Sequence, residues 1–242
     1  MFCFHGYGLD GSSFAFLEPV LGHEYTLICI DLPFHGSTIW QEGLLMATED
    51  LLDIMQQVHP CQGKAFSLLG YSMGGRVALH VLQAVPAQIK KVVLIAPDGL
   101  RHNFWQQLAT QYAAGRRLFH YTMLHPNWLF GLINFAARIK LLNKSIAKFA
   151  QNHINNPEER KALYKRWLTM RDFSTNTHLL KQLIERYKIP VNMLFGQFDR
   201  VIPSKAGLAF KGTSNLTTIK EIPAGHQLLK EQYAADIAGL FS

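Results

Sequence analysis

The sequence of 242 residues predicts an α/β fold, in which a mostly parallel, doubly wound sheet carries a helical insertion. Short apolar runs rich in β-branched residues alternate with helix-like segments, which is typical of a parallel sheet covered by helices on both faces. Runs such as Thr26–Ile30 and Val92–Ile95 are apolar throughout, as expected of strands buried on both faces. The alternation stops after Pro97 and resumes at Val191, so the chain between them is predicted to be an insertion.

The predicted elements follow one another in regular order. The predicted strands are Met1–His5, Tyr25–Leu32, Ala65–Gly70, Lys91–Ala96, Val191–Phe195 and Leu216–Ile222. Helical patterns cover Ser13–Val20, Gly43–Gln57, Met73–Val85, Ser204–Lys211 and Gln227–Leu240. Residues 98–188 contain no good strand and are predicted to form several helices, the last of which ends before Pro190. We therefore expect a core of residues 1–97 and 189–242 and a helical cap of residues 98–188.

Composition restricts the class of protein. Apolar residues make up 48% and charged residues 17% of the chain, which predicts a packed interior rather than disorder. Leu118–Ala137 has no Lys, Arg, Asp or Glu, but two histidines, a proline and two asparagines interrupt it, which argues against a transmembrane span. We expect no secretory signal, because Met1–Gly6 has no basic segment before an apolar run. Three scattered cysteines without C-x-x-C spacing argue against a disulfide framework or zinc site and favour the cytoplasm.

The net charge of +7 is unevenly distributed along the chain. Residues 98–188 hold 15 Lys/Arg and 5 Asp/Glu, whereas the remainder holds 9 Lys/Arg and 12 Asp/Glu. This asymmetry gives the predicted cap a surface that can contact an anionic substrate or, weakly, a membrane surface. No nucleic-acid-binding motif accompanies the charge, so no nucleic-acid partner is expected.

Ser72 is the candidate nucleophile. It lies in Gly70-Tyr71-Ser72-Met73-Gly74, a G-x-S-x-G pattern between a predicted strand and a predicted helix. That setting holds a serine on a sharp turn with its hydroxyl exposed, and glycines on both sides relieve crowding in the turn.

A serine hydroxyl needs a base, and the base needs an orienting group. His226 follows the last predicted strand and is the predicted base. Asp199 lies just beyond the strand Val191–Phe195 and is the predicted orienting acid, with Asp98 as the rival beyond Lys91–Ala96. The predicted order of Ser, Asp and His along the chain is the one found with a serine on such a strand–turn–helix element.

Backbone N–H groups are the predicted oxyanion donors. Met73 begins the helix after the serine, where the helix dipole adds to the effect of position. Tyr7 supplies the second predicted donor from the loop His5-Gly6-Tyr7-Gly8, which follows the first strand.

These motifs, with Asp31-Leu32-Pro33-Phe34-His35-Gly36-Ser37 and Gly225-His226, give the chain a resemblance to the α/β-hydrolase superfamily over almost its whole length. The resemblance implies an eight-stranded sheet, a helical cap between strands six and seven, and a nucleophilic mechanism without cofactor or metal. One departure is that this family has two antiparallel strands before the His-Gly loop, which here begins at residue 5. The absence of that hairpin would leave an exposed edge strand.

Within the superfamily, Gly70–Arg76 together with Asp31-Leu32-Pro33 is similar to small carboxylesterases. It also resembles the menaquinone-pathway group of 2-succinyl-6-hydroxy-2,4-cyclohexadiene-1-carboxylate synthases, whose elimination requires cations to hold carboxylates. Arg76 is the candidate for such substrate binding. A serine at position 72 argues against the dehalogenases and epoxide hydrolases, whose nucleophile is aspartate.

The predicted cap contributes candidate pocket residues. Trp105 and Tyr112 are the predicted substrate contacts among its many large aromatic groups, which otherwise form the cap's own core. The predicted function is a serine hydrolase that cleaves a small or medium-sized ester or thioester substrate through an acyl-enzyme. The alternatives are a lyase or carbon–carbon hydrolase with the same three residues and a non-catalytic ligand-binding protein.

Overall fold

The structure is a computed structural model that describes residues 1–59, 63–101, 104–138 and 155–241, without the side chains of 104–106, 134, 137 and 138. The chain divides into two compact units. The first, the sheet unit, comprises Met1–Ile39, Ala47–Arg101 and Phe173–Ser242. The second, the helical unit, comprises Trp40–Met46 and His102–Asp172.

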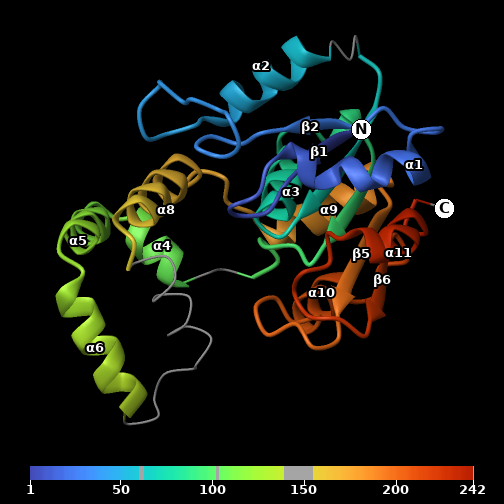
Figure 1. The fold of residues 1–242 in the computed structure, drawn as a ribbon. Coiled ribbons are helices and arrows are strands. Elements are labelled where there is room, and N and C mark those ends of the chain that lie inside the picture. The colour runs from blue at the N-terminus through green and yellow to red at the C-terminus, as the bar shows by residue number, and fades with distance from the viewer. Residues whose placement is uncertain (60–62, 102–103, 139–154, 242) are drawn as a thin grey trace. The chain divides into compact units, whose positions relative to one another are not determined.

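Six parallel strands form the sheet of the first unit, in the order β2-β1-β3-β4-β5-β6 (Figure 1). Their bounds are β1 Phe2–Phe4, β2 Ile28–Ile30, β3 Phe66–Tyr71, β4 Ile89–Ile95, β5 Val191–Gly196 and β6 Thr217–Ile222. Each predicted strand corresponds to one of these, and the α/β fold with a parallel sheet is confirmed. The edge strands are β2 and β6.

The expectation of eight strands was wrong for the described residues, which form six. The first strand, β1, already leads into the His-Gly loop, so the two strands that would precede this loop are not part of residues 1–242. The helical insertion accordingly follows β4 and precedes β5.

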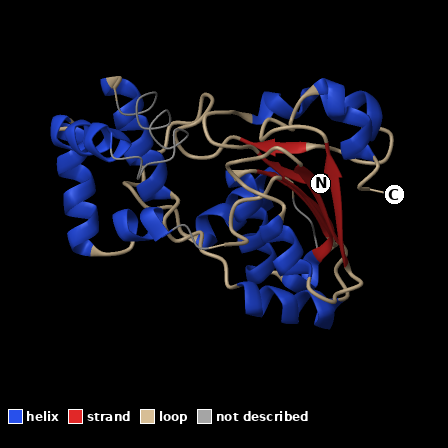
Figure 2. Ribbon diagram, turned by 90° about the horizontal axis from the view of Figure 1, so that it is seen from below, coloured by secondary structure: helices blue, strands red, loops and turns tan. Residues whose placement is uncertain are grey.

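Alternate strand residues pack on opposite faces of the sheet, as the two-residue repeat of a strand requires. Cys3, Leu69, Val93 and Leu194 join a buried cluster with residues of the first and last helical segments. The neighbouring residues of the same strands, such as Phe4, Leu68 and Phe195, are also fully buried. Figure 2 shows helices on both sides of the strands, which explains why inner strands such as β3 and β5 are mostly apolar, whereas the edge strand β6 exposes Thr218, Lys220 and Glu221.

The helical segments of the sheet unit connect its strands. They are η1 Gly11–Leu17, α1 Glu18–Leu21, α2 Thr48–Val58, α3 Met73–Ala84, η2 Pro86–Gln88, α9 Thr177–Tyr187, α10 Lys205–Lys211, η3 Glu231–Tyr233 and α11 Ala234–Ala238. Two predicted helices differ in extent. Ser13–Val20 is mostly a 3-10 helix, and Gln227–Leu240 becomes helical only from Glu231, so the residues just after His226 form a loop.

The described part of the helical unit contains α4 Phe104–Thr110, α5 Ala113–Leu124, α6 Asn127–Arg138 and α8 Pro157–Thr169. This unit ends at Asp172, earlier than the predicted cap boundary at 188, because α9 packs against α3 and belongs to the sheet unit. Trp40–Met46, a segment before α2, belongs to the helical unit as well. None of the described helices has the length and apolar character needed to cross a membrane.

Candidate active site

The turn between β3 and α3 carries Ser72 in a strained conformation. Ser72 has φ 51° and ψ −115°, in a region that residues other than glycine rarely adopt. The neighbouring glycines allow the close packing of this turn. A Cβ on Gly74 would lie 1.9 Å from the carbonyl oxygen of Phe4, and a Cβ on Gly70 would lie 2.5 Å from that of Gly74. The turn therefore has no room for a side chain at position 70 or position 74.

Backbone hydrogen bonds hold the strained residue. Ser72 N–H donates to the carbonyl of Ile95 on β4 over 2.9 Å. The carbonyl of Ser72 accepts from Gly75 N–H at 2.9 Å and from Asp98 N–H at 2.8 Å. The neighbouring strand β4 and the segment that follows it thus contribute two of these three contacts.

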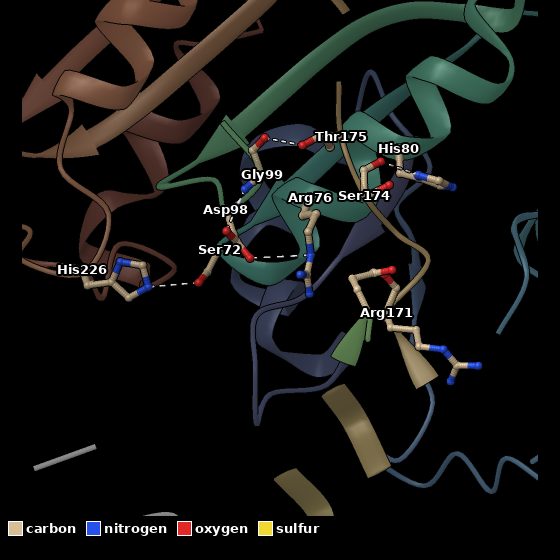
Figure 3. A network of polar contacts seen from close by, with 10 residues as sticks. Ser72, Arg76, His80, Asp98, Gly99, Arg171, Ser174, Thr175 and His226 are labelled. Carbon is tan, nitrogen blue, oxygen red and sulfur yellow. Dashed lines mark hydrogen bonds and ion pairs between the residues drawn. The ribbon is translucent and has the colours of Figure 1, made fainter. Parts of the chain in front are cut away.

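Ser72, His226 and Asp199 form one line of hydrogen bonds. Ser72 Oγ lies 3.0 Å from His226 Nε2, and His226 Nδ1 lies 2.7 Å from Asp199 Oδ2. Figure 3 shows the imidazole of His226 pointing at the serine hydroxyl. Because an ionised carboxylate only accepts, Nδ1 carries the proton and Nε2 is free to accept from the serine. The structure therefore brings together the three side chains selected from the sequence.

Both oxygens of the Asp199 carboxylate accept hydrogen bonds. Its side chain has no exposed surface, and its second oxygen, Oδ1, accepts from Val201 N–H at 2.7 Å and Ile202 N–H at 2.9 Å. These backbone donors satisfy the oxygen that faces away from His226 and fix the carboxylate's orientation. Asp199 lies three residues after the end of β5, and His226 lies four residues after the end of β6, so two adjacent parallel strands position the pair.

Tyr71 contacts His226, a role that the sequence did not predict. Its hydroxyl donates to the carbonyl of His226 at 3.1 Å, and its ring is stacked on the imidazole with 5.7 Å between centroids. Burial, together with the negative charge of Asp199, raises the pKa of Tyr71 to about 12. The neutral hydroxyl is therefore retained, and it keeps the His226 loop on β3. No pattern in the sequence distinguishes this tyrosine, because the position before the serine is unrestricted in the motif.

The loop after β1 lies against the nucleophile. A Cβ on Gly6 would come within 2.9 Å of the Tyr71 ring and 3.5 Å of Ser72 Cβ. His5 is completely buried and holds this loop: its Nε2 accepts from Leu32 N–H at 3.1 Å, so its Nδ1 carries a proton and donates to Gly6 O at 2.8 Å. This bond fixes the peptide whose N–H belongs to Tyr7. Met73, the other predicted oxyanion donor, is the first residue of α3, where N–H groups have no acceptor within the helix.

The rival acid Asp98 does not contact His226. Its Oδ2 lies 3.6 Å from Nε of Arg76, and its Oδ1 accepts from Gly99 N–H at 2.8 Å. Arg76, predicted to bind substrate, therefore faces a carboxylate of its own chain (Figure 3).

The predicted cap residues belong to the helical unit. Tyr112, just before α5, is 64% exposed, and its substrate contact stays a prediction. The side chain of Trp105 lies outside the described residues. Among the residues that the structure describes, no group of three or more His, Cys, Asp or Glu side chains could hold a metal ion.

Fold and site together define a class of protein, the α/β hydrolases with a serine nucleophile. The alpha/beta hydrolase fold family matches residues 1–233, and the chain belongs to this family. The Ser–His–Asp arrangement is the one that its serine hydrolases use.

The individual relatives have low sequence identity to this chain. The chain is 33% identical over 99 residues to a serine hydrolase-like protein of Danio rerio, a match covering 40% of this chain and 30% of that protein. It is 27% identical over 232 residues to the dihydrolipoyllysine-residue acetyltransferase component of the acetoin cleaving system of Pseudomonas putida, covering 94% and 58%. The chain thus spans less than two thirds of the length of both relatives. Among solved structures, it resembles a thermophilic esterase from Thermogutta terrifontis, with a TM-score of 0.67, 19% identity, and coverage of 99% and 87%.

Proposed function

We propose that this chain cleaves a small or medium-sized carboxylic ester or thioester through an acyl-enzyme on Ser72. The observation that carries the proposal is the line of hydrogen bonds from Ser72 Oγ through His226 to the buried carboxylate of Asp199. An imidazole held by a carboxylate at Nδ1 and by a hydroxyl at Nε2 has the geometry of a base that activates a nucleophile.

The chemistry divides into two steps. Ser72 Oγ attacks the carbonyl carbon while His226 Nε2 accepts the hydroxyl proton, and Asp199 stabilises the imidazolium. Collapse of the tetrahedral intermediate expels the alcohol or thiol, which takes the proton from His226. Water then gives a proton to His226 and attacks the acyl group, and the carboxylic acid leaves as His226 returns that proton to Ser72.

The negative oxygen of each tetrahedral intermediate needs donors that are already in place. The N–H groups of Met73 and Tyr7 are the proposed donors. Two observations support them. Met73 is the first residue of α3, and the loop that contains Gly6 lies against Ser72, where His5 orients the peptide between Gly6 and Tyr7. Removal of one such donor typically costs about 3–4 kcal/mol of transition-state stabilisation.

An ester or thioester is the preferred substrate class, although a lyase or carbon–carbon hydrolase would use the same three residues. The resemblance to a named esterase extends over 99% of the chain and concerns the fold. The proposed substrate is a small molecule, and the proposed location is the cytoplasm.

The test is acyl-enzyme formation. With p-nitrophenyl esters of increasing chain length, we expect a burst of one p-nitrophenol per enzyme, followed by slower turnover. A fluorophosphonate probe should label the wild type and leave Ser72→Ala unlabelled. Labelling that persists in Ser72→Ala would reject this nucleophile. Turnover of an activated ester without a burst or labelling would favour the lyase-type chemistry, and absence of any turnover would favour a binding protein.

A further inference from the structure

We propose that Asp98, paired with Arg76, is a positioning residue that holds Ser72 in its reactive conformation. The inference rests on the proposed function, since it assigns a further role at the same site. It concerns four parts of the sheet unit: the nucleophile turn, α3, the segment 98–101 after β4, and the segment 173–176 before α9.

The conformation of Ser72 requires support from outside the turn. A residue other than glycine at φ 51° persists only where its surroundings determine it, because such a conformation costs about 1–3 kcal/mol. One hydrogen bond to the Ser72 carbonyl comes from Gly75 N–H, but Gly75 belongs to the same turn and moves with it. Asp98 N–H comes from another element, so its bond of 2.8 Å ties the turn to the end of β4.

Asp98 can hold that carbonyl because its own backbone is fixed by its side chain. Its Oδ1 accepts from Gly99 N–H at 2.8 Å, which closes a tight local turn, and its Oδ2 lies 3.6 Å from Arg76 Nε. The side chains of Arg76 and Asp98 are only 12% and 28% exposed, so water screens this ion pair less than one on the surface. Arg76 lies one helical turn after Ser72 on α3, and Figure 3 shows the pair bridging this helix and the segment after β4.

The segment 98–101 has little freedom to move. Gly99 has φ 97° and lies directly on Arg76, since a Cβ at Gly99 would be 3.1 Å from the Arg76 Cα. Its carbonyl accepts from the Thr175 hydroxyl. The adjacent Ser174 carbonyl accepts in turn from His80 Nδ1 at 2.9 Å and Gln83 Nε2 at 3.2 Å, both on α3. The segments 98–101 and 173–176 are therefore tied to the helix that begins after the nucleophile.

Loss of the Asp98–Arg76 pair is expected to affect chemistry and leave substrate binding unchanged. Without the carboxylate, the Asp98 backbone is no longer held at the Ser72 carbonyl, and the serine can relax away from its 3.0 Å contact with His226. A misplacement of about 1 Å in a reacting group can lower a rate about a hundredfold. The expected signature is therefore a lower kcat with an unchanged KM.

A substrate-binding role for Arg76 gives a different signature. If its guanidinium bound a carboxylate of the substrate, its removal would raise the KM of an anionic ester and leave a neutral ester of the same acyl length unaffected. The two roles are therefore separated by comparing kcat and KM for such a pair of esters.

The experiment uses the full chain and four variants: Asp98→Ala, Asp98→Asn, Arg76→Met and the Asp98→Asn/Arg76→Met double variant. The main readout is the second-order rate of labelling by a fluorophosphonate, which reports on Ser72 without ester turnover. Burst rate and KM for the neutral and anionic esters follow, and all rates are measured well below the Tm of each variant. The matched control is Asp236→Asn, which removes another ion pair of the sheet unit, Asp236–Lys220 at 2.8 Å.

We expect Asp98→Ala to lower the labelling and burst rates about tenfold or more. Asp98→Asn retains an acceptor for Gly99 N–H and should lose less, about threefold, as should Arg76→Met. Because the two charges act as one unit, the double variant should lose no more than either single variant. The control should label at the wild-type rate.

Three results would overturn the inference alone. The first is a labelled wild type with equally labelled variants of normal Tm, and the second is an Arg76→Met effect confined to the KM of the anionic ester. A lower Tm with unchanged labelling of the folded variants would also overturn it, because the pair would then contribute only to stability. A wild type that is neither labelled nor acylated would reject the proposed function itself, and the inference with it.

Discussion

Ser72 is placed where reactivity and stability have opposite requirements. Its φ of 51° turns the hydroxyl towards His226, and the same backbone angle is unfavourable for a residue with a Cβ. Neighbouring backbone groups compensate through three hydrogen bonds to its N–H and carbonyl. The strain is thus part of how the nucleophile is presented.

Substitution of Ser72 separates these two requirements. Ser72→Ala should lower kcat by about four to six decades and leave the free energy of unfolding nearly unchanged, because alanine keeps the Cβ. Ser72→Gly should be equally inactive and more stable by about 1 kcal/mol, because glycine adopts φ 51° without strain. Ester turnover and urea unfolding of the three proteins provide the measurement. A Ser72→Gly variant no more stable than Ser72→Ala would argue against strain at this residue.

Tyr71 should make stability depend on pH in the alkaline range. Its pKa is raised from 10.0 to about 12, so folding favours the neutral phenol. The stabilisation is fully present below pH 10 and is lost as the pH rises towards 12, by up to about 2–3 kcal/mol. Unfolding by urea at pH 9 and pH 11.5 should show a smaller loss for Tyr71→Phe than for the wild type. Equal losses in the two proteins would contradict the raised pKa.

At the scale of elements, α3 is the component that connects the site. It begins at the nucleophile, packs against α9, and holds the segments 98–101 and 173–176 through Arg76, His80 and Gln83. Its first turn approaches β1 so closely that only glycine fits at position 74.

Two helical glycines should respond to alanine with opposite signs. Gly74→Ala places a Cβ 1.9 Å from the Phe4 carbonyl oxygen, so α3 must shift, and both the free energy of unfolding and the labelling of Ser72 should fall. Gly131→Ala, in α6, meets nothing within 4 Å and should stabilise the protein by up to about 1 kcal/mol. Thermal unfolding of the two variants tests this contrast. Similar Tm changes in both would contradict it.

At the scale of the whole molecule, charge and exposed apolar groups gather in the same part of the chain. No Asp or Glu occurs between residues 99 and 157, which include seven Lys or Arg. The described helices α5 and α6 lie in this range and expose large apolar side chains, including Tyr121 at 55%, Leu132 at 54% and Phe135 at 61%. Basic and exposed aromatic groups together are typical of a surface that lies against anionic lipid.

The helical unit should therefore bind anionic vesicles. We expect co-sedimentation with vesicles of phosphatidylcholine and phosphatidylglycerol, less with phosphatidylcholine alone, and release by salt. The double variant Leu132→Ala/Phe135→Ala should bind more weakly, whereas Ile39→Ala, at a position 82% exposed in the sheet unit, should bind like the wild type. If the variants change the KM of long-chain esters and bind vesicles normally, these residues contact substrate instead.

Much of the architecture was predictable because its signals are local. A strand buried on both faces is apolar along most of its length, so apolar runs revealed the inner strands, and the ends of the predicted strands indicated where Ser72, Asp199 and His226 would meet. The helix expected over Gln227–Leu240 was too long, because an apolar repeat does not distinguish a loop packed on the core from a helix packed on it. The helical pattern of α9 likewise does not indicate whether this helix packs on α3, as it does in the structure, or elsewhere.

The sequence alone determined the parallel α/β class and the three side chains proposed for catalysis, because hydrophobic burial and strand ends leave a readable pattern in the order of residues. Only the tertiary structure decided what holds those side chains. Three contacts join residues far apart in the chain. Tyr71 contacts the His226 loop, the buried His5 holds the proposed oxyanion loop through Leu32, and Asp98 pairs with Arg76 rather than with His226. Such contacts depend on distances and directions between packed elements, which residue order does not encode locally.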